Sequence, residues 1–326
     1  MRNIGWVGRT GAWYKRGMSL HVGCRTLSKF DPLQRAQVTA WLWYPTLAAT
    51  QPTRFGAYSV DVAQDAEPAQ AAQPFPLVAL SHGNGSTPFT HRGLATHLVR
   101  EGFAVVLIEH PGNNRNDNSL GIRAVGERVK LALLEHRPRH VVLAIDAALD
   151  DAVLGERLAR GAYAIIGESI GAYTALAVAG GRAMTLPDDF DPAHLDAPAE
   201  LARFAIAVPT QPDQRVYAAV LFSPALGFFN ADGSLGDVTA PLLVRSGEHD
   251  AMCPTAQVRF SLRSVRDPAR VQHLEVPGAG HFSFQTPYPK ELAHLPSAQD
   301  PPGFDRAAYQ ATLHRDVTAF LRSATA

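Results

Sequence analysis

The pentapeptide Gly167-Glu168-Ser169-Ile170-Gly171 carries the clearest chemical signal in the sequence. It follows an apolar run at residues 163–166 and precedes an alanine-rich run at residues 172–177. A G-x-S-x-G motif between a strand and a helix is typical of a sharp turn that lifts the serine hydroxyl above the sheet. We therefore predict that Ser169 is a nucleophile. A structural turn serine between two glycines is the simpler alternative.

A serine hydroxyl needs a base within hydrogen-bond reach to act as a nucleophile at neutral pH. Two later apolar runs end near suitable residues, because residues 242–246 lead to Asp250 and residues 271–276 lead to His281. In chains with such a serine turn, the acid is expected to come next in the sequence and the histidine last. We expect His281 to be the general base and Asp250 to orient it. Asp250 is preferred to Glu248 because it lies further along the loop.

Acyl transfer through Ser169 would also need donors for the negative charge that develops on the carbonyl oxygen. One backbone N–H should come from Ile170, the residue after the nucleophile, and the second from the loop at residues 81–85. Within that loop the Asn84 amide is the best-placed candidate. His82 could be a second catalytic base, but support of this loop is the simpler interpretation.

These residues can meet only if several strands end at one edge of a sheet. Short apolar runs alternate with helical segments, a pattern typical of strands buried on both faces by crossover helices. We predict helices at residues 90–101 and after Pro138, where Val142, Ile145 and Leu149 share one face. The predicted strands are residues 20–27, 38–44, 75–80, 103–108, 163–166, 216–222, 241–244 and 271–276.

Two stretches interrupt this alternation. Residues 57–73 are rich in Ala, Gln and Asp, and we interpret them as a surface connection. Residues 181–215 contain five prolines and little room for a buried strand. We predict that they form a small cap or partial lid over the carboxyl edge of the sheet; a surface excursion without function is the alternative. Length and pattern together favour one α/β domain over residues 1–326.

Composition narrows the classes of partner. The chain has 30 basic and 30 acidic residues, which gives no reason to expect nucleic acid or an anionic membrane as a partner. No apolar run is long enough to span a bilayer, and no secretory signal is visible, so a cytoplasmic location is the default expectation. Cys24 and Cys253 are the only cysteines, and we interpret both as buried structural thiols whose pairing the sequence leaves open. The oligomeric state is also open.

Motifs for cofactors are missing from the sequence. It contains neither a Walker loop nor a G-x-G-x-x-G fingerprint. His136 and His140 are four residues apart, but Pro138 between them should break the helix that would align two metal ligands. His110, at the end of a predicted strand, could line the mouth of a pocket, but packing or loop hydrogen bonding is the simpler interpretation. We predict no metal and no cofactor.

An ordered set of motifs resembles the platelet-activating-factor acetylhydrolase family and, more closely, its bacterial relatives known as predicted dienelactone hydrolases. The resemblance extends from about Val22 to Phe320. Dienelactone hydrolases proper have a cysteine where this chain has Ser169, so the resemblance does not fix the substrate. The motifs that carry it are Trp43-Tyr44-Pro45, Ser81-His82-Gly83-Asn84-Gly85, His110-Pro111-Gly112, Arg137-Pro138, the serine turn, Gly280-His281-Phe282-Ser283-Phe284 and residues 301–306.

The resemblance implies an α/β-hydrolase fold with a mostly parallel central sheet flanked by helices. It also implies a Ser169–Asp250–His281 triad, no metal, and small-molecule esters with short acyl groups as substrates. An amidase, peptidase or lipase could use the same triad. A binding module that has kept the fold is a further alternative, although all three triad positions are filled.

Overall fold

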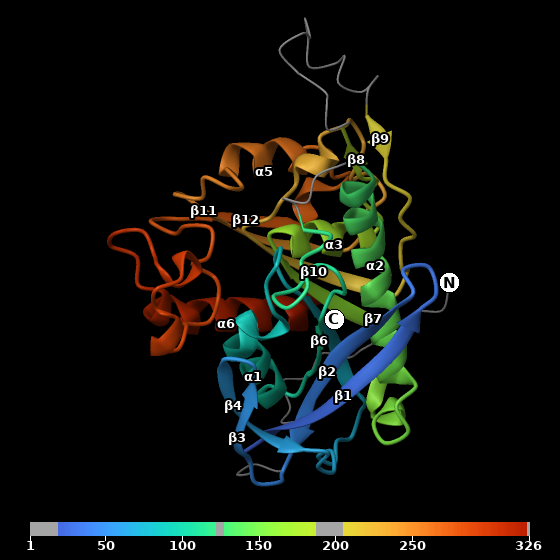
Figure 1. Ribbon diagram of the computed structural model, residues 1–326, viewed down its shortest axis with the longest axis vertical. Coiled ribbons are helices and arrows are strands. Elements are labelled where there is room, and N and C mark those ends of the chain that lie inside the picture. The colour runs from blue at the N-terminus through green and yellow to red at the C-terminus, as the bar shows by residue number, and fades with distance from the viewer. Residues whose placement is uncertain (1–18, 122–126, 187–204, 325–326) are drawn as a thin grey trace, which may run out of the picture.

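A ten-stranded sheet forms the centre of the computed structural model, which describes residues 19–121, 127–186 and 205–324. The strand order is β12-β11-β10-β7-β5-β6-β2-β1-β4-β3, and helices cover both faces (Figure 1). Six neighbouring strands, from β12 to β6, run parallel. Their bounds are Phe75–Ser81 (β5), Ala104–Ile108 (β6), Leu158–Glu168 (β7), Val216–Phe222 (β10), Leu242–Gly247 (β11) and Val271–Val276 (β12).

The sequence predicted all six of these strands, and it missed mainly their ends. Strand β7 begins at Leu158 and strand β11 continues to Gly247, both beyond the predicted runs. All six carboxyl ends lie at one edge of the sheet, because parallel strands point the same way. Open α/β sheets bind their ligands at that edge. The mostly parallel sheet with flanking helices confirms the predicted fold class.

The first part of the chain adds an antiparallel section. Strand β1 (His21–Asp31) pairs along its whole length with β2 (Ala36–Thr46), and β2 pairs antiparallel with β6. Strands β3 (Gln51–Phe55) and β4 (Tyr58–Gln64) form an outer hairpin. The prediction that residues 57–73 are only a surface connection is therefore wrong for β4. Its Ala-, Gln- and Asp-rich surroundings hid a period-two pattern in which Tyr58 and Val62 are buried.

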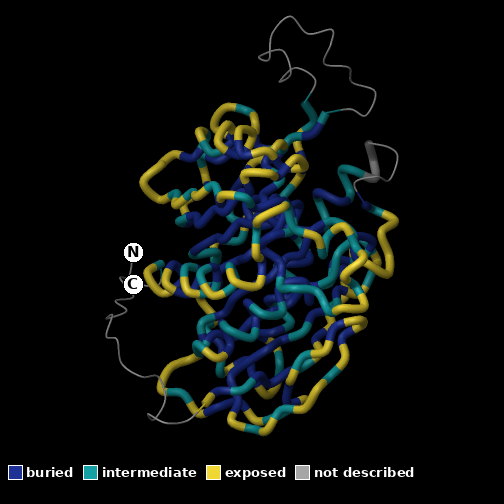
Figure 2. The backbone as a smooth tube through the Cα atoms, turned by 90° about the vertical axis from the view of Figure 1, so that its left-hand side faces the viewer, coloured by how far each residue is buried: buried dark blue, intermediate teal, exposed yellow. Residues whose placement is uncertain are grey.

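Side chains of the central strands alternate between two apolar cores. In β5, Leu77 and Ala79 belong to one core and Val78 and Leu80 to the other. The first core is covered by α2 (Glu127–Leu149), α3 (Ile170–Val178) and α5 (Thr255–Leu262), and the second by α1 (Arg92–Arg100) and α6 (Arg306–Ala324). Figure 2 shows the resulting buried centre with exposed residues along the outer loops.

Helix α2 differs from its predicted form because it begins at Glu127 and continues through Pro138. A proline in a helix leaves the carbonyl four residues earlier without its N–H partner. Here that carbonyl belongs to Leu134, and it accepts a hydrogen bond of 2.9 Å from the Tyr173 hydroxyl. The expectation that Pro138 breaks the helix between His136 and His140 is thus wrong, since the helix is continuous there and their rings stack at a centroid distance of 6.3 Å.

The proline-rich stretch is described only at its ends, where β8 (Met184–Thr185) and β9 (Ile206–Ala207) pair antiparallel. Residues 187–204, which hold most of the predicted lid, lie outside the described residues. None of the helices formed by the described residues has the length and apolar character needed to cross a bilayer.

Candidate active site

Ser169 lies at the junction of β7 and α3, in a backbone conformation that is rare for a residue with a side chain. Its φ and ψ angles are 54° and −120°, and it is 9% exposed. Non-glycine residues at positive φ are uncommon, and the strain they carry is found mainly at functional sites. The predicted strand–turn–helix therefore has the sharp turn that the motif requires.

The glycines on either side of Ser169 are required by close backbone contacts. A Cβ added to Gly171 would lie 2.1 Å from the Ser81 carbonyl oxygen, and one added to Gly167 would lie 2.1 Å from the Gly171 carbonyl oxygen. No side chain fits at such distances. Because Gly171 packs on the end of β5, the same contact brings the serine turn against the loop at residues 81–85.

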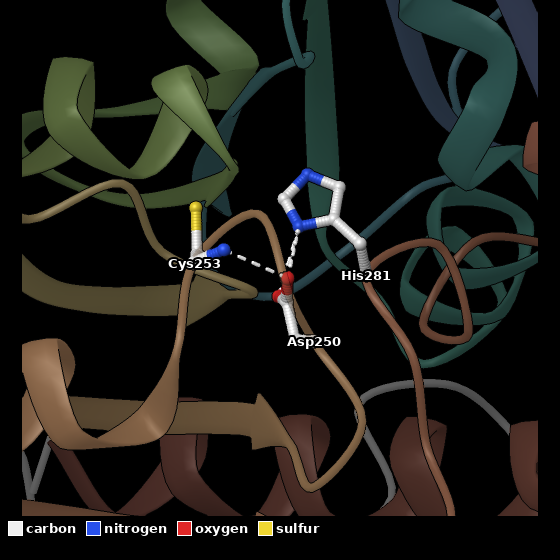
Figure 3. Close-up of side chains that lie close together, drawn as sticks. All are labelled: Asp250, Cys253 and His281. Atoms are coloured by element: carbon white, nitrogen blue, oxygen red, sulfur yellow. Dashed lines mark hydrogen bonds and ion pairs between the residues drawn. The ribbon is translucent and has the colours of Figure 1, made fainter.

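Asp250 and His281 are brought into direct contact by the loops after β11 and β12. His281 Nδ1 lies 2.9 Å from Asp250 Oδ1 and 2.8 Å from Oδ2, as Figure 3 shows. Oδ1 also accepts hydrogen bonds from the backbone N–H groups of Met252 and Cys253, at 2.9 and 2.8 Å. The carboxylate is therefore held on one side by its own loop and on the other by the imidazole.

This pairing controls the charge of the imidazole. Burial by itself lowers the pKa of His281, but the hydrogen bond with Asp250 and the neighbouring Cys253 outweigh it and raise the pKa to about 10. A carboxylate at Nδ1 leaves Nε2 as the atom that can take up or release a proton. The pair can therefore stabilise an imidazolium, which a general base must become during acyl transfer.

Ser169 and His281 are not joined by a hydrogen bond, but both are bonded to residues 222–225. The Ser169 N–H donates to the Phe222 carbonyl at 2.9 Å, and the Ala225 N–H donates to the Ser169 carbonyl at 3.1 Å. The Ser223 hydroxyl donates to the His281 carbonyl at 2.7 Å. The segment after β10 thus connects the serine turn with the histidine loop.

Glu248, the less favoured acid, has a different environment. Its side chain accepts a hydrogen bond of 2.8 Å from the Gly278 N–H and lies at the surface. The contact with His281 is made by Asp250 instead. The geometry of the two loops therefore favours Asp250 over Glu248 as the partner of His281.

A fully buried arginine holds the loop after β5, and in the sequence it stood out only as part of a family motif. Arg137 of α2 donates hydrogen bonds to the Thr174 hydroxyl at 3.0 Å, to Asn113 Oδ1 at 2.5 Å, to the Ser81 hydroxyl at 3.1 Å and to the His82 carbonyl. No carboxylate among the described residues pairs with it, and burial lowers the pKa of its guanidinium. A positive charge therefore lies directly beneath this loop.

Asn84, the predicted second donor, is connected to Arg137 through Asn113. The Asn113 side-chain amide donates to Asn84 Oδ1 at 2.9 Å and to Asn118 Oδ1 at 2.8 Å, while its oxygen accepts from Arg137. Ile170, the other predicted donor, is the first residue of α3. N–H groups in the first turn of a helix have no intrahelical acceptor and point toward the side where anions bind.

Buried histidines complete the support of the same loop. His82 Nδ1 lies 2.7 Å from the Gly83 carbonyl oxygen, and burial together with Arg137 lowers the pKa of His82 to about 3. A neutral ring bound to its own loop fits the interpretation of His82 as a supporting residue. His110 contacts the Ser81 hydroxyl at 2.9 Å and His140 at 3.2 Å, which is the loop role predicted for it.

Glu168, next to the nucleophile candidate, is a second residue whose environment the sequence did not reveal. It is 1% exposed and lies 3.1 Å from His91 Nε2 and 2.5 Å from Gln285 Nε2. Burial raises the pKa of its carboxyl group, but the hydrogen bond and charge of His91 outweigh burial and lower the pKa. His91 and Gln285 come from distant segments, so no local pattern could have indicated this cluster.

Comparisons with known proteins agree with this architecture. Neither a protein-family model nor a curated protein matches the chain. Among solved structures, a ferulic acid esterase from Streptomyces cinnamoneus is similar with a TM-score of 0.59 and 18% identity, covering 94% of this chain and 90% of that one. A dienelactone hydrolase-like promiscuous phosphotriesterase, P91 from metagenomic libraries, is similar with a TM-score of 0.55 and 15% identity over 92% and 99%. The chain has the α/β-hydrolase fold.

Proposed function

We propose that the protein is a serine carboxylic-ester hydrolase in which Ser169 is the nucleophile, His281 the general base and Asp250 the orienting acid. The observation that carries the proposal is the buried Asp250–His281 pair, bonded through residues 222–225 to a serine in a strained turn. The fold alone would not suffice, because one fold hosts many functions.

The first half-reaction acylates the enzyme. His281 Nε2 takes the proton of the Ser169 hydroxyl while the oxygen attacks the ester carbonyl, and the resulting imidazolium is stabilised by Asp250. His281 then gives the proton to the leaving alkoxide, which departs as an alcohol. In the second half-reaction His281 deprotonates a water molecule and the hydroxide attacks the acyl carbon. The bond between that carbon and the Ser169 oxygen then breaks, His281 returns its proton to Ser169, and the carboxylic acid leaves.

Negative charge develops on the carbonyl oxygen in both half-reactions. The backbone N–H groups of Ile170 and Asn84 are proposed to hold it, supported by the position of Ile170 at the start of α3 and by the Asn113–Asn84 hydrogen bond. Because Arg137 lies under the Asn84 loop, its charge adds a favourable potential at the same place.

The proposed substrate class is supported by the sequence motifs and by one of the similar structures. The motifs resemble those of platelet-activating-factor acetylhydrolases and their bacterial relatives, which favours esters with short acyl groups. One of the similar structures belongs to a ferulic acid esterase. We therefore expect small-molecule esters, and we expect the rate to fall as the acyl chain lengthens.

A series of p-nitrophenyl esters of increasing acyl length tests the proposal. Ser169→Ala should lower kcat by about 10⁶-fold, whereas the exposed Ser28→Ala should leave it unchanged. A fluorophosphonate probe should label the wild type and Ser28→Ala but not Ser169→Ala. Equal labelling of all three proteins would contradict the proposal. A rate that climbs steadily to long acyl chains would instead indicate a lipase.

A further inference from the structure

The thiol of Cys253 lies beside the Asp250–His281 pair, and the proposed reaction gives it no part. Figure 3 shows the Cys253 sulfur and the His281 ring side by side above the Asp250 carboxylate. The sulfur, a carboxylate oxygen and a ring nitrogen all lie within 4.8 Å of one another. Cys253 is a free cysteine, so its sulfur is not held in a disulfide.

The loop after β11 fixes this arrangement. The Cys253 N–H donates to Asp250 Oδ1 at 2.8 Å, so the cysteine backbone is fastened to the same carboxylate that holds His281 Nδ1. The three residues are 4%, 6% and 7% exposed in the order Asp250, Cys253, His281. They are buried enough to exclude most water: the Asp250 side chain is fully covered, and the His281 side chain is 6% exposed.

This donor set matches one class of ion. Zinc binds thiolate sulfur, imidazole nitrogen and carboxylate oxygen, and its tetrahedral bond lengths place the donor atoms about 3–4 Å apart. Asp250 Oδ2 and His281 Nδ1, which are 2.8 Å apart, would separate slightly to admit the ion, and all the donor atoms already lie within 4.8 Å of one another. Calcium and magnesium prefer sets made of oxygen atoms, and a thiolate selects softer ions.

We propose that Asp250, Cys253 and His281 form an inhibitory binding site for zinc or a similar thiophilic divalent cation. Binding releases to solvent the thiol proton of Cys253 and the Nδ1 proton of His281, and it places His281 Nδ1, the nitrogen facing Asp250, on the metal. The ring proton then resides on Nε2. An imidazole protonated at Nε2 cannot accept the proton of the Ser169 hydroxyl, so metal binding and acyl transfer exclude each other.

Binding is tested with the full chain, independently of any reaction. Cadmium titrated into the wild type should produce the ultraviolet charge-transfer band of a cadmium thiolate, and calorimetry with zinc chloride should give one such site per chain. Cys253→Ser should abolish the band and weaken zinc binding at least about tenfold. Cys24→Ser, at the other buried free cysteine, is the matched control and should retain both signals. A band of unchanged size in Cys253→Ser would overturn the site.

Inhibition is tested with p-nitrophenyl acetate, and this half of the inference rests on the proposed esterase function. Zinc should suppress the wild-type rate, and a chelator should restore it. Cys253→Ser, compared with its own metal-free rate, should need at least about tenfold more zinc for the same suppression. A cadmium thiolate band without any loss of rate would overturn the inhibitory role. If Ser169→Ala hydrolysed the ester as fast as the wild type, the esterase proposal would fail while the band still reported the metal site.

Discussion

The loop after β5 packs against the serine turn, and the loops after β11 and β12 are connected to that turn through residues 222–225, yet different interactions hold these loops in place. The first rests on Arg137, a buried cation whose partners are two hydroxyls, an amide oxygen and a backbone carbonyl. The second contains a carboxylate bound to an imidazole. In the proposed reaction the loop after β5 must stay fixed while negative charge develops next to it. His281, in the loop after β12, must instead take up and release a proton.

Because different interactions hold the two regions, mutations in them should affect activity in different ways. Replacing a member of the Asp250–His281 pair removes a reacting group or its orientation. Replacing Arg137 leaves every reacting group in the protein and removes the support of the loop that presents Asn84, together with one contact to Thr174 of α3. The predictions below separate these two effects by size and by the kinetic constant that changes.

Asp250→Asn should have the largest effect of the substitutions outside Ser169. The amide cannot stabilise an imidazolium and favours the wrong tautomer of His281, so kcat for p-nitrophenyl acetate should fall about 10⁴-fold with KM nearly unchanged. Glu248→Gln is the matched control on the same loop, and as a surface substitution it should change the rate by about twofold at most. A larger loss of kcat in Glu248→Gln than in Asp250→Asn would contradict the assignment of Asp250 and would identify Glu248 as the acid.

Arg137→Met should lower kcat about 10²-fold, because a loop displacement of about 1 Å near the reacting atoms has an effect of that size. The methionine nearly preserves the volume but leaves the His82 carbonyl and the Asn113 oxygen without their donor. Arg139→Met is the control on the same helix, since Arg139 pairs with Asp31 instead.

The Arg137 result must be separated from simple loss of folded protein. Both variants should be assayed at temperatures well below their unfolding midpoints, and the fraction of active sites should be counted with the fluorophosphonate probe. A positioning role predicts a low kcat per labelled site. If the rate per labelled site in Arg137→Met equals that of the wild type, Arg137 only stabilises the fold.

The contrast between the two regions also explains what the sequence could and could not predict. Ser169, Asp250 and His281 are of reactive types and follow strands whose apolar runs are visible, so their shared edge could be inferred. Arg137 lies in a helix that the sequence placed only after Pro138, and its partners come from three other segments. Such long-range polar contacts leave no local spacing, and the same holds for Glu168 with His91 and Gln285.

The pH dependence of the wild type should show the influence of Asp250 directly. His281 must be neutral to act as a base, and its pKa is raised from 6.5 to about 10. The value of kcat/KM, which reports the free enzyme, should therefore keep rising with pH above 6.5 instead of levelling off there. In Asp250→Asn the rise should shift to lower pH. A wild-type plateau starting near pH 6.5 would contradict the raised value.

The same shift contributes to stability with a defined sign. A histidine whose pKa is higher in the folded state stabilises the fold fully below pH 6.5, and this contribution is lost as the pH rises toward 10. In thermal unfolding, the difference in midpoint between the wild type and Asp250→Asn should shrink between pH 6.5 and 10 and should change less below pH 6.5. A constant difference between the two proteins would indicate that the pair does not set the pKa.

Gly83→Ala should have the smallest effect on the rate. It tests the place where the loop after β5 meets the serine turn. A Cβ at this position would lie 3.6 Å from Ser169 Cβ and 3.7 Å from Glu168 Oε2, which is ordinary van der Waals contact. The protein itself therefore accommodates the methyl group, and fluorophosphonate labelling and thermal stability should stay near wild type. The rate for p-nitrophenyl acetate should change by about twofold at most, within the range of mild substitutions. A loss of rate well above tenfold with normal stability would mean that the substrate occupies the space beside Gly83. The absence of a side chain at this position would then be needed for ester binding and not for packing of the loop.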